Sequence, residues 1–457
     1  MMHFNSLKGW LLWQEGFHSQ VIDLGLERVN AVFRRLMPAG SQLPTVTVAG
    51  TNGKGSCIAL LASIYQAQGY RVGAFTSPHI LNYNERISIN GQPVADALIC
   101  AAFERIEACR DGVSLSFFEF STLAALDIFS RENLDVQLLE VGLGGRLDAV
   151  NIVDTDAAII SSIGIDHSDW LGDTRDAIAI EKAGIFRTGI PAIVGDPVPP
   201  TSLLQAARAC GATLRCIGQD FTYHSTADGW AWQGADRHYV ALPFPALKGQ
   251  HQFLNASAVL SAIEYLQERL PVDEAAIRSG LTGVRLNGRF QFIDAAVPIL
   301  LDVGHNPQAV STLLEYVIQA FPSRRLHAVF AMMKDKDIQG VVEIMQPVVY
   351  DWFIAPLDNP RAATMPMLEA VFKEAGITRF MGDFIDFKSA FKQALHSSTA
   401  DDLIVVFGSF FLVSAYLAEI GSDFAAIALM GSESPRLQTT LDSTVIQNAQ
   451  IGEAMCQ

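Results

Sequence analysis

The sequence has few cysteines, no excess of basic residues and no long apolar run. Its six cysteines form no Cys-x-x-Cys pair, which argues against a disulfide scaffold and predicts reduced thiols in a cytoplasmic protein. Lys and Arg number 32 against 48 Asp and Glu, and the net charge of -16 argues against a nucleic-acid-binding surface. Gln14 and Glu15 interrupt the apolar Trp10–Trp13 run, so we expect neither a signal peptide nor a membrane span.

What the sequence does contain is an alternation of strand-like and helix-like segments along 457 residues. In the first half, strands are expected at Arg71–Ser77, Val136–Glu140, Ala157–Gly164 and Ala192–Gly195, and a helix at Phe117–Asn133. A second series, beginning at Pro298, has strands at Ile299–Val303, Leu326–Met332, Trp352–Ala355 and Leu403–Phe407. This pattern predicts an α/β fold with a doubly wound, mostly parallel sheet, followed by a smaller Rossmann-like domain.

Changes in composition indicate where the domains divide. We expect an N-terminal domain over residues 1–286, a linker over 287–296 and a C-terminal domain over 297–420. Within the first domain, Asp220–Tyr239 has the texture of a small β excursion. The tail over 421–457 is rich in Ser, Thr and Gln, and we expect it to be poorly ordered.

The most informative segment is Thr45–Ser56, in which a β-branched strand runs into a glycine-rich loop and a helix. The N–H groups of such a turn and the helix dipole attract anions. Lys54 can reach a β- or γ-phosphate, and Ser56 can hold magnesium. Gly55 separates these two residues, unlike the common P-loop, so an ordinary tight turn is an alternative. We favour a nucleotide-binding P-loop.

Polar residues also follow the other expected strands. They are Ser77-Pro78-His79, Glu140 before the glycine turn 142–148, and Asp166-His167. Magnesium takes one or two carboxylates plus phosphate oxygens, so Glu140 beside Ser56 suits it. Each has an ordinary alternative, such as a turn, an unrelated acid or a structural histidine, and Lys182 can be a surface lysine paired with Glu181.

The second domain contains Asp302–Pro307 at the end of its first expected strand. Asn306 followed by Pro307 is typical of a capped helix start, with proline at the first helical position. A helix start and a ligand-binding role are compatible here.

Taken together and in this order, these motifs resemble the Mur-ligase superfamily and, within it, the folylpolyglutamate synthase/dihydrofolate synthase family. The resemblance covers about Gly16 to Leu417. It rests on Ile22–Arg28, Gly50–Ser56, Ser77–His79, Glu85-Arg86, Phe118-Glu119, Glu140–Asp148, Asp166-His167, Glu181–Phe186, Gly288–Gln291, Asp302–Pro307 and Lys334–Asp337. It implies an ATP-dependent amide ligase that phosphorylates a substrate carboxylate and joins it to the amine of L-glutamate.

The resemblance also assigns residues. ATP would contact Thr51, Asn52, Gly53, Lys54, Gly55, Ser56, Asn255, Arg289 and Asp302 in an interdomain cleft. Ser56, Ser77 and Glu140 would hold one magnesium ion, and His167 would share a second with Glu140. A carbamylated Lys182 would support the metal site. Lys54, His167 and Lys182 are the implied catalytic residues, and no organic prosthetic group is expected.

For the pterin substrate, the family's site maps onto Ile22, Asp23, Leu24, Gly25, Ser116, Phe117, Phe118, Glu119, Leu147, Asp148 and Ala149, with Phe118 placed to stack on a flat ring. The Ser116–Glu119 segment resembles that of bifunctional bacterial members. These add the first glutamate to 7,8-dihydropteroate and later glutamates to reduced folates. The expected partners are therefore small molecules, with no nucleic acid or membrane, and the family's usual state is a monomer.

Two alternatives stay open at this stage. One is a folylpolyglutamate synthase without the dihydrofolate synthase activity, and the other is a P-loop ATPase of another class without a small-molecule acceptor. A peptidoglycan-type Mur ligase is disfavoured, because only 44 residues precede the first expected strand. Two positions depart from the family: Gly304 stands where alanine is common, and Asn287 precedes Gly288 where proline is frequent.

Overall fold

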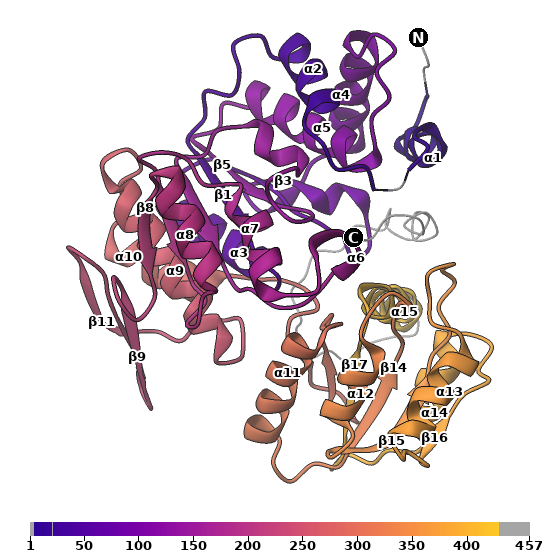
Figure 1. The fold of residues 1–457 in the computed structure, drawn as a ribbon. Coiled ribbons are helices and arrows are strands. Elements are labelled where there is room, and N and C mark those ends of the chain that lie inside the picture. The colour runs from indigo at the N-terminus through magenta and orange to yellow at the C-terminus, as the bar shows by residue number, and fades with distance from the viewer. Residues whose placement is uncertain (1–3, 21, 429–457) are drawn as a thin grey trace. The chain divides into compact units, whose positions relative to one another are not determined.

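The computed structural model describes residues 4–20 and 22–428 of the chain. These form two compact units, which Figure 1 colours from indigo to yellow along the sequence. The first unit contains the residues up to 79 together with 84–286, and the second contains 80–83 together with the residues from 287 on. The second unit thus begins within the stretch expected to be a linker.

The first unit is built on an eight-stranded sheet of order β4-β3-β2-β5-β1-β6-β7-β8. The strands are β1 (Thr45–Ala49), β2 (Val72–Phe75), β3 (Ile87–Ile89), β4 (Gln92–Pro93), β5 (Val136–Glu140), β6 (Ala157–Ile160), β7 (Pro191–Val194) and β8 (Thr213–Cys216). Pairing is parallel from β2 to β8, and antiparallel only for β3 and β4. The expected doubly wound, mostly parallel sheet is confirmed.

Helices cover both faces of this sheet, as right-handed crossovers require. They are α1 (Leu7–Phe17), α2 (Glu27–Leu36), α3 (Lys54–Ala67), α4 (Asp96–Cys109), α5 (Phe117–Arg131), α6 (Ser168–Leu171), α7 (Arg175–Ala183), α8 (Thr201–Cys210), α9 (His251–Tyr265) and α10 (Glu274–Gly283), with 3-10 turns at Tyr83–Arg86, Ala149–Ile152 and Leu266–Glu268. The strand residues Val46 and Val48 pack in one core with α3, α9 and α10. Burial of this core fixes the faces of α3 and α9 against the sheet.

A small antiparallel sheet of order β11-β10-β9 lies beside this core, made of β9 (Thr222–Thr226), β10 (Gly229–Gln233) and β11 (His238–Leu242). Trp230 and Trp232 on β10 are fully buried in the main core. The expected β excursion is confirmed, and the two indoles attach it to the first unit.

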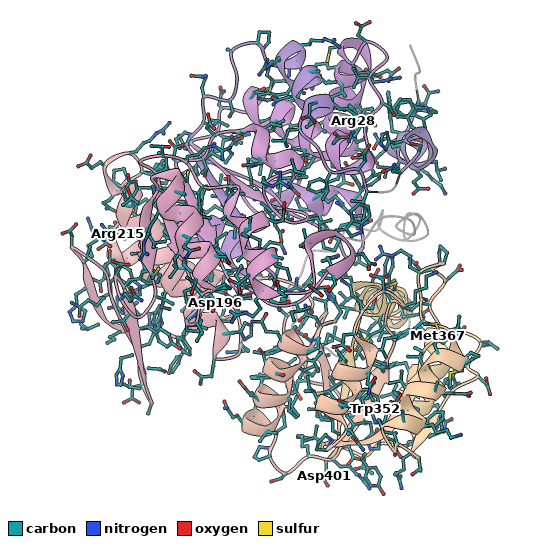
Figure 2. The ribbon with its side chains drawn as sticks, viewed as in Figure 1. Arg28, Asp196, Arg215, Trp352, Met367 and Asp401 are labelled. Atoms are coloured by element: carbon teal, nitrogen blue, oxygen red, sulfur yellow. The ribbon has the colours of Figure 1, made fainter. Side chains whose placement is uncertain are left out.

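The second unit has a six-stranded sheet of order β12-β13-β17-β14-β15-β16. Its strands are β12 (Gln291–Ile293), β13 (Ile299–Leu301), β14 (Leu326–Phe330), β15 (Val349–Ile354), β16 (Phe380–Met381) and β17 (Leu403–Phe407), and its helices are α11 (Pro307–Ala320), α12 (Ile338–Met345), α13 (Met365–Glu374), α14 (Phe387–His396) and α15 (Phe410–Ala428). Along β14, Ala328 and Phe330 point into the core under α11–α13, whereas Val329 points into the core under α14 and α15. Trp352 on β15, labelled in Figure 2, packs in the core under α11–α13.

Three details differ from or complete the sequence expectations. The expected linker contains β12, which pairs antiparallel with β13 at the sheet edge. Helix α15 continues past Gly421 to Ala428, so the irregular tail does not begin there, and residues 429–457 lie outside the described part of the chain. Asn306 caps α11 with Pro307 in its first turn, as predicted. No helix in the described ranges has the length and apolarity that crossing a bilayer requires.

Candidate functional site

The glycine-rich loop joins β1 to α3 at the carboxyl end of the central strand. Gly53 is the N-cap residue of α3 and has a left-handed φ of 89°, a conformation that glycine adopts without steric cost. A Cβ at Gly53 would come within 2.5 Å of Oδ1 of Asn255 on α9. The structure therefore places Asn255 directly against the loop, and glycine is required there by both conformation and space.

Neighbouring polar groups hold the loop in place. The N–H of Thr51 donates to the carbonyl of Ser162 (2.7 Å), and the hydroxyls of Ser161 and Ser162 both donate to the carbonyl of Asn52 (2.6 and 3.0 Å). Ser161 and Ser162 follow β6, the strand next to β1. The sequence analysis missed these two serines because it placed them inside an expected strand over 157–164, whereas β6 ends at Ile160.

Two lysines approach the same backbone oxygen. Nζ of Lys54 and Nζ of Lys182 donate to the carbonyl oxygen of Gly50, at 3.0 and 2.9 Å respectively. Burial, and to a smaller extent the charge of Lys54, lower the pKa of Lys182 to about 7, although Asp166 and Asp148 partly oppose both effects. Lys182 is thus a buried amine beside the phosphate-type loop and not a surface lysine.

Ser56, Ser77 and Glu140 meet where α3 begins. Oε2 of Glu140 accepts a hydrogen bond from the N–H of Ser77 (3.0 Å), and the Glu140 carboxylate lies 3.8 Å from the Cβ position of Gly55. Oγ of Ser77 is buried without a hydrogen-bond partner among the described residues. Oγ of Ser56 accepts from Nε2 of Gln252 at 3.4 Å. Two hydroxyls and one carboxylate fit the oxygen ligands of magnesium.

A denser metal cluster is absent from the part of the chain that the structure describes, where no group of three or more His, Cys, Asp or Glu side chains could hold an ion. His167 lies half-buried at the start of α6, and its main-chain N–H donates to Oδ1 of Asp166 (2.8 Å). A magnesium site that relies on phosphate oxygens and water needs few protein ligands. The second-ion role of His167 therefore stays a prediction.

One segment assigned to the pterin lies against the glycine turn that leads into another, 147–149. A Cβ at Gly142 would come within 2.6 Å of the Phe118 ring, so the ring fits against this turn only because residue 142 is glycine. Asp148 is buried and accepts hydrogen bonds from the N–H groups of Leu143 (2.8 Å) and Val150 (3.0 Å). Burial raises the pKa of Asp148 to about 6 in spite of these bonds. Asp148 thereby shapes the turn in addition to any contact with a ligand.

In the second unit, Arg289 and Asp302 are neighbours. The Asp302 carboxylate accepts from the N–H groups of Phe290 (3.2 Å) and Gly304 (2.7 Å). Burial raises its pKa, and the charge of Arg289 counters this. The Arg289 guanidinium lies 5.0 Å from the centre of the Phe410 ring.

Comparison with known proteins decides the family. Residues 288–410 match the model described as "Mur ligase, glutamate ligase domain". The dihydrofolate synthase/folylpolyglutamate synthase of Escherichia coli strain K12 is 41% identical over 414 residues, which cover 91% of this chain and 95% of that protein. The chain belongs to the dihydrofolate synthase/folylpolyglutamate synthase family.

Solved structures of family members agree with this assignment. E. coli FolC in complex with DHPP and ADP has a TM-score of 0.87 and 41% identity, covering 93% of this chain and 100% of that one. A bifunctional folylpolyglutamate synthase/dihydrofolate synthase with Mn, AMPPNP and L-glutamate bound has a TM-score of 0.83 and 40% identity, covering 91% and 98%. The predicted family is confirmed. A divalent metal and an ATP analogue are therefore ligands of a close family relative.

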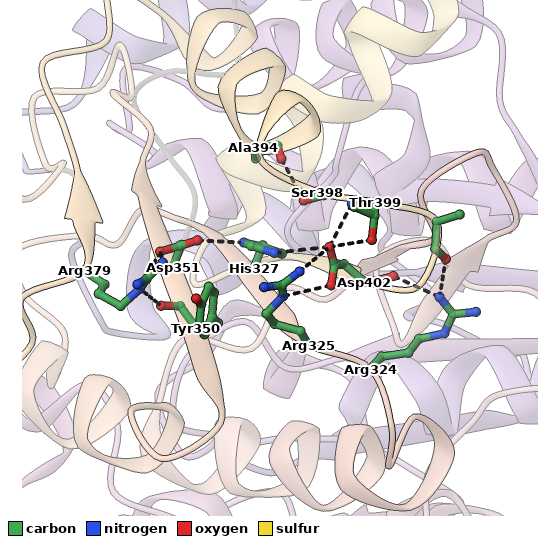
Figure 3. Close-up of polar contacts among 11 residues, drawn as sticks. Arg324, Arg325, His327, Tyr350, Asp351, Arg379, Ala394, Ser398, Thr399 and Asp402 are labelled. Atoms are coloured by element: carbon green, nitrogen blue, oxygen red, sulfur yellow. Dashed lines mark hydrogen bonds and ion pairs between the residues drawn. The ribbon is translucent and has the colours of Figure 1, made fainter.

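A second group of charged side chains surrounds a buried histidine in the second unit, toward the amino ends of β14, β15, β16 and β17 (Figure 3). His327 is buried, with Nδ1 3.3 Å from Asp351 and Nε2 3.7 Å from Asp402. Arg379 pairs with Asp351 (2.7 Å) and Arg325 with Asp402 (3.0 Å). The sequence analysis named none of these five residues.

Proposed function

We propose that this chain is a bifunctional ligase that adds L-glutamate to 7,8-dihydropteroate and to reduced folates in an ATP-dependent reaction. In the first step a substrate carboxylate oxygen attacks the γ-phosphorus of ATP and ADP leaves. In the second step the glutamate amine attacks the acyl phosphate, loses a proton, and phosphate leaves. The observation that carries this proposal is the meeting of Lys54, Ser56, Ser77 and Glu140 at the carboxyl edge of the first sheet.

This arrangement suits phosphoryl transfer, which depends mainly on positioning and charge neutralisation. Gly53 and Gly55 offer backbone N–H groups at the start of α3, and Lys54 adds a positive charge. Asn255 adjoins the loop and is proposed to contact the nucleotide, as are Thr51, Asn52, Arg289 and Asp302. Ser56, Ser77 and Glu140 would hold magnesium, which neutralises phosphate charge when bound.

Lys182 is proposed to be carbamylated. At a pKa of about 7 a substantial part of the amine is neutral at physiological pH and can attack carbon dioxide. The product is an anion in place of a cation. Because Lys54 donates to the same carbonyl as Lys182, carbamylation would replace a like-charge pair with an opposite-charge pair.

The pterin is proposed to lie among Ile22–Gly25, Ser116–Glu119 and Leu147–Ala149, with Phe118 as the stacking ring. Phe118 is half-buried, so its ring is partly covered by Gly142 and partly open. The bifunctional family members that match this chain support both activities. The scarcity of cysteine supports a cytoplasmic location, and the monomeric state and the small-molecule partners follow from the family.

The test is phosphate release dependent on ATP, magnesium and L-glutamate, run separately with 7,8-dihydropteroate and with tetrahydrofolate. We expect turnover with both acceptors. Turnover with tetrahydrofolate alone would reduce the proposal to a folylpolyglutamate synthase. Phosphate release that does not respond to glutamate would overturn it in favour of a P-loop ATPase of another class.

A further inference from the structure

Segment 22–25, which carries four of the proposed pterin contacts, lies between α1 and α2 and forms no helix or strand. Such a segment needs side chains to hold it in one conformation. Two residues outside the proposed site supply these contacts. His18 is the C-cap residue of α1, and Arg28 lies in the first turn of α2.

Both residues bind Asp23. Nε2 of His18 lies 2.9 Å from Oδ2 of Asp23, and Nη1 of Arg28 lies 2.8 Å from the same oxygen. Nη2 of Arg28 also donates to the main-chain carbonyl of Asp23 (2.7 Å). These contacts fix both the side chain and the backbone of Asp23. Because a carboxylate only accepts hydrogen bonds, Nε2 of His18 carries the proton in this contact.

Arg28 also reaches the second pterin segment, 116–119, and His18 reaches Ser114, two residues before that segment. Nδ1 of His18 lies 2.7 Å from Oγ of Ser114, and Nη2 of Arg28 lies 3.4 Å from Oε1 of Glu119. Oε1 of Glu119 is buried and has no hydrogen-bond partner among the described residues, so Arg28 is the cation that compensates it. The other oxygen, Oε2, accepts from the N–H of Ser116 in the capping box of α5.

The location of Arg28 strengthens this interpretation. A cation in the first turn of a helix faces the positive end of the helix dipole, which is unfavourable. Figure 2 shows Arg28 among the helices of the first unit, where Asp23 and Glu119 both lie in reach. Its place is explained by these two carboxylates and not by α2 itself.

We propose that His18 and Arg28 are positioning residues, which hold segment 22–25 against segment 116–119 so that both meet the pterin of the substrate. This inference rests on the proposed function. It predicts that their loss weakens binding of the pterin substrate and leaves the ATP site, built on other strands, unaffected.

The test compares Arg28→Met and His18→Leu with Arg35→Met. Arg35 lies two turns further along α2, is 43% exposed and pairs with Asp111 instead. For the first two variants we expect KM for 7,8-dihydropteroate to rise about 10-fold, the scale of one lost charged hydrogen bond, with KM for ATP unchanged. Arg35→Met should match the wild type in both.

Two further variants separate positioning from a general structural role. Gln at position 18 retains an amide donor for Asp23, so His18→Gln should recover most of the lost affinity, whereas Arg28→Lys retains the charge but not both contacts to Asp23. Equal rises in both KM values, or a fall in kcat with both KM values unchanged, would overturn the proposal. Direct titration with 7,8-dihydropteroate distinguishes the two failures: if wild type binds it and the variants bind equally well, positioning is wrong, and if wild type neither binds nor turns over, the proposed function is wrong.

Discussion

The two groups of charged residues at the ends of the strands in this protein are built in opposite ways. At the carboxyl edge of the first sheet, Lys54 and Lys182 place two amines on one carbonyl oxygen, and the charge of Lys54 contributes to the lowered pKa of Lys182. At the amino ends of the strands in the second sheet, the ion pairs Arg379–Asp351 and Arg325–Asp402 lie on either side of His327, whose pKa burial lowers. The first arrangement sets two basic groups against each other, and in the second an arginine compensates each carboxylate.

The difference indicates what each group is for. Like charges held together in a buried place destabilise the fold, and are retained where a ligand of opposite charge will join them. Opposite charges that pair within the protein compensate each other and need no ligand. We therefore expect substitutions in the first group to change activity more than stability, and substitutions in the second to do the reverse.

The largest effect is expected at Lys54. Lys54→Met should lower glutamate-dependent phosphate release about 1,000-fold, because it removes a preorganised cation from the phosphate loop. In buffer free of carbon dioxide, where Lys182 is not carbamylated, the melting temperature should hold or rise, since the repulsion between Lys54 and Lys182 is lost. Steady-state kinetics and thermal unfolding measure the two quantities. Lys8→Met, at an exposed lysine of α1, is the matched control, and a large fall in melting temperature for Lys54→Met would contradict the comparison.

Glu140→Gln should cost about 100-fold in activity, the upper range for altered metal coordination. The amide retains an oxygen for the N–H of Ser77 but removes the negative charge. The magnesium concentration that gives half-maximal activity should therefore rise. Glu132→Gln changes an acid paired with Arg71 on the surface and should leave the magnesium dependence as it is. An unchanged magnesium dependence in Glu140→Gln would remove this residue from the metal site.

Carbamylation of Lys182 predicts a smaller, reversible effect. With carbon dioxide lowered to a trace, activity should be about 10-fold lower at pH 6 than at pH 8, with recovery on adding bicarbonate. The sign follows from the pKa of about 7: only the neutral amine attacks carbon dioxide, and about a tenth of it is neutral at pH 6 against about nine tenths at pH 8. Carbon NMR with isotopically labelled bicarbonate would detect the carbamate directly. Its absence in active wild-type protein would sink the idea.

The sequence predicted the first group far better than the second, for a physical reason. Glu140 ends a short buried strand and Lys54 follows another through a glycine-rich loop, and this local pattern indicates the carboxyl edge of a sheet. His327 and Asp351 become neighbours only because β14 and β15 pair in that register, which no local pattern specifies.

The same reasoning explains the other gains and misses. The strands over 136–140 and 403–407 have the predicted bounds, since each is a short apolar run bounded by polar residues. Strand β12 was missed because its only pairing is with β13 across the sheet edge. His18 contacts Ser114 and Arg28 contacts Glu119, and in each pair the two residues are about 90 or more positions apart in the sequence. No local motif predicts such contacts.

The smallest effect is expected at His327, and it concerns stability. Burial lowers the pKa of His327, and the opposing pull of Asp351 and Asp402 is weakened because each already pairs with an arginine. Hydrogen bonds from Arg325 and Thr399 outweigh burial at Asp402 and hold its pKa at about 2, so Asp402 stays charged. Asp402 thus keeps its charge over the range in which a histidine titrates.

A histidine whose pKa is lowered in the folded state makes the free energy of unfolding decrease as the pH falls. Above the ordinary histidine pKa of about 6.5 neither state is protonated, and below it the unfolded chain takes up the proton first. The wild-type melting temperature should therefore decrease more steeply from pH 7 to pH 5 than that of His327→Gln, and the difference between the two slopes separates this residue from groups such as Asp148, whose raised pKa acts in the opposite direction. His396→Gln, on α14 of the same unit, should retain the wild-type slope. A wild-type slope that is shallower than that of His327→Gln, or of opposite sign to it, would mean that Asp351 and Asp402 stabilise a charged His327, and the second group would then hold a charged histidine instead of a neutral one.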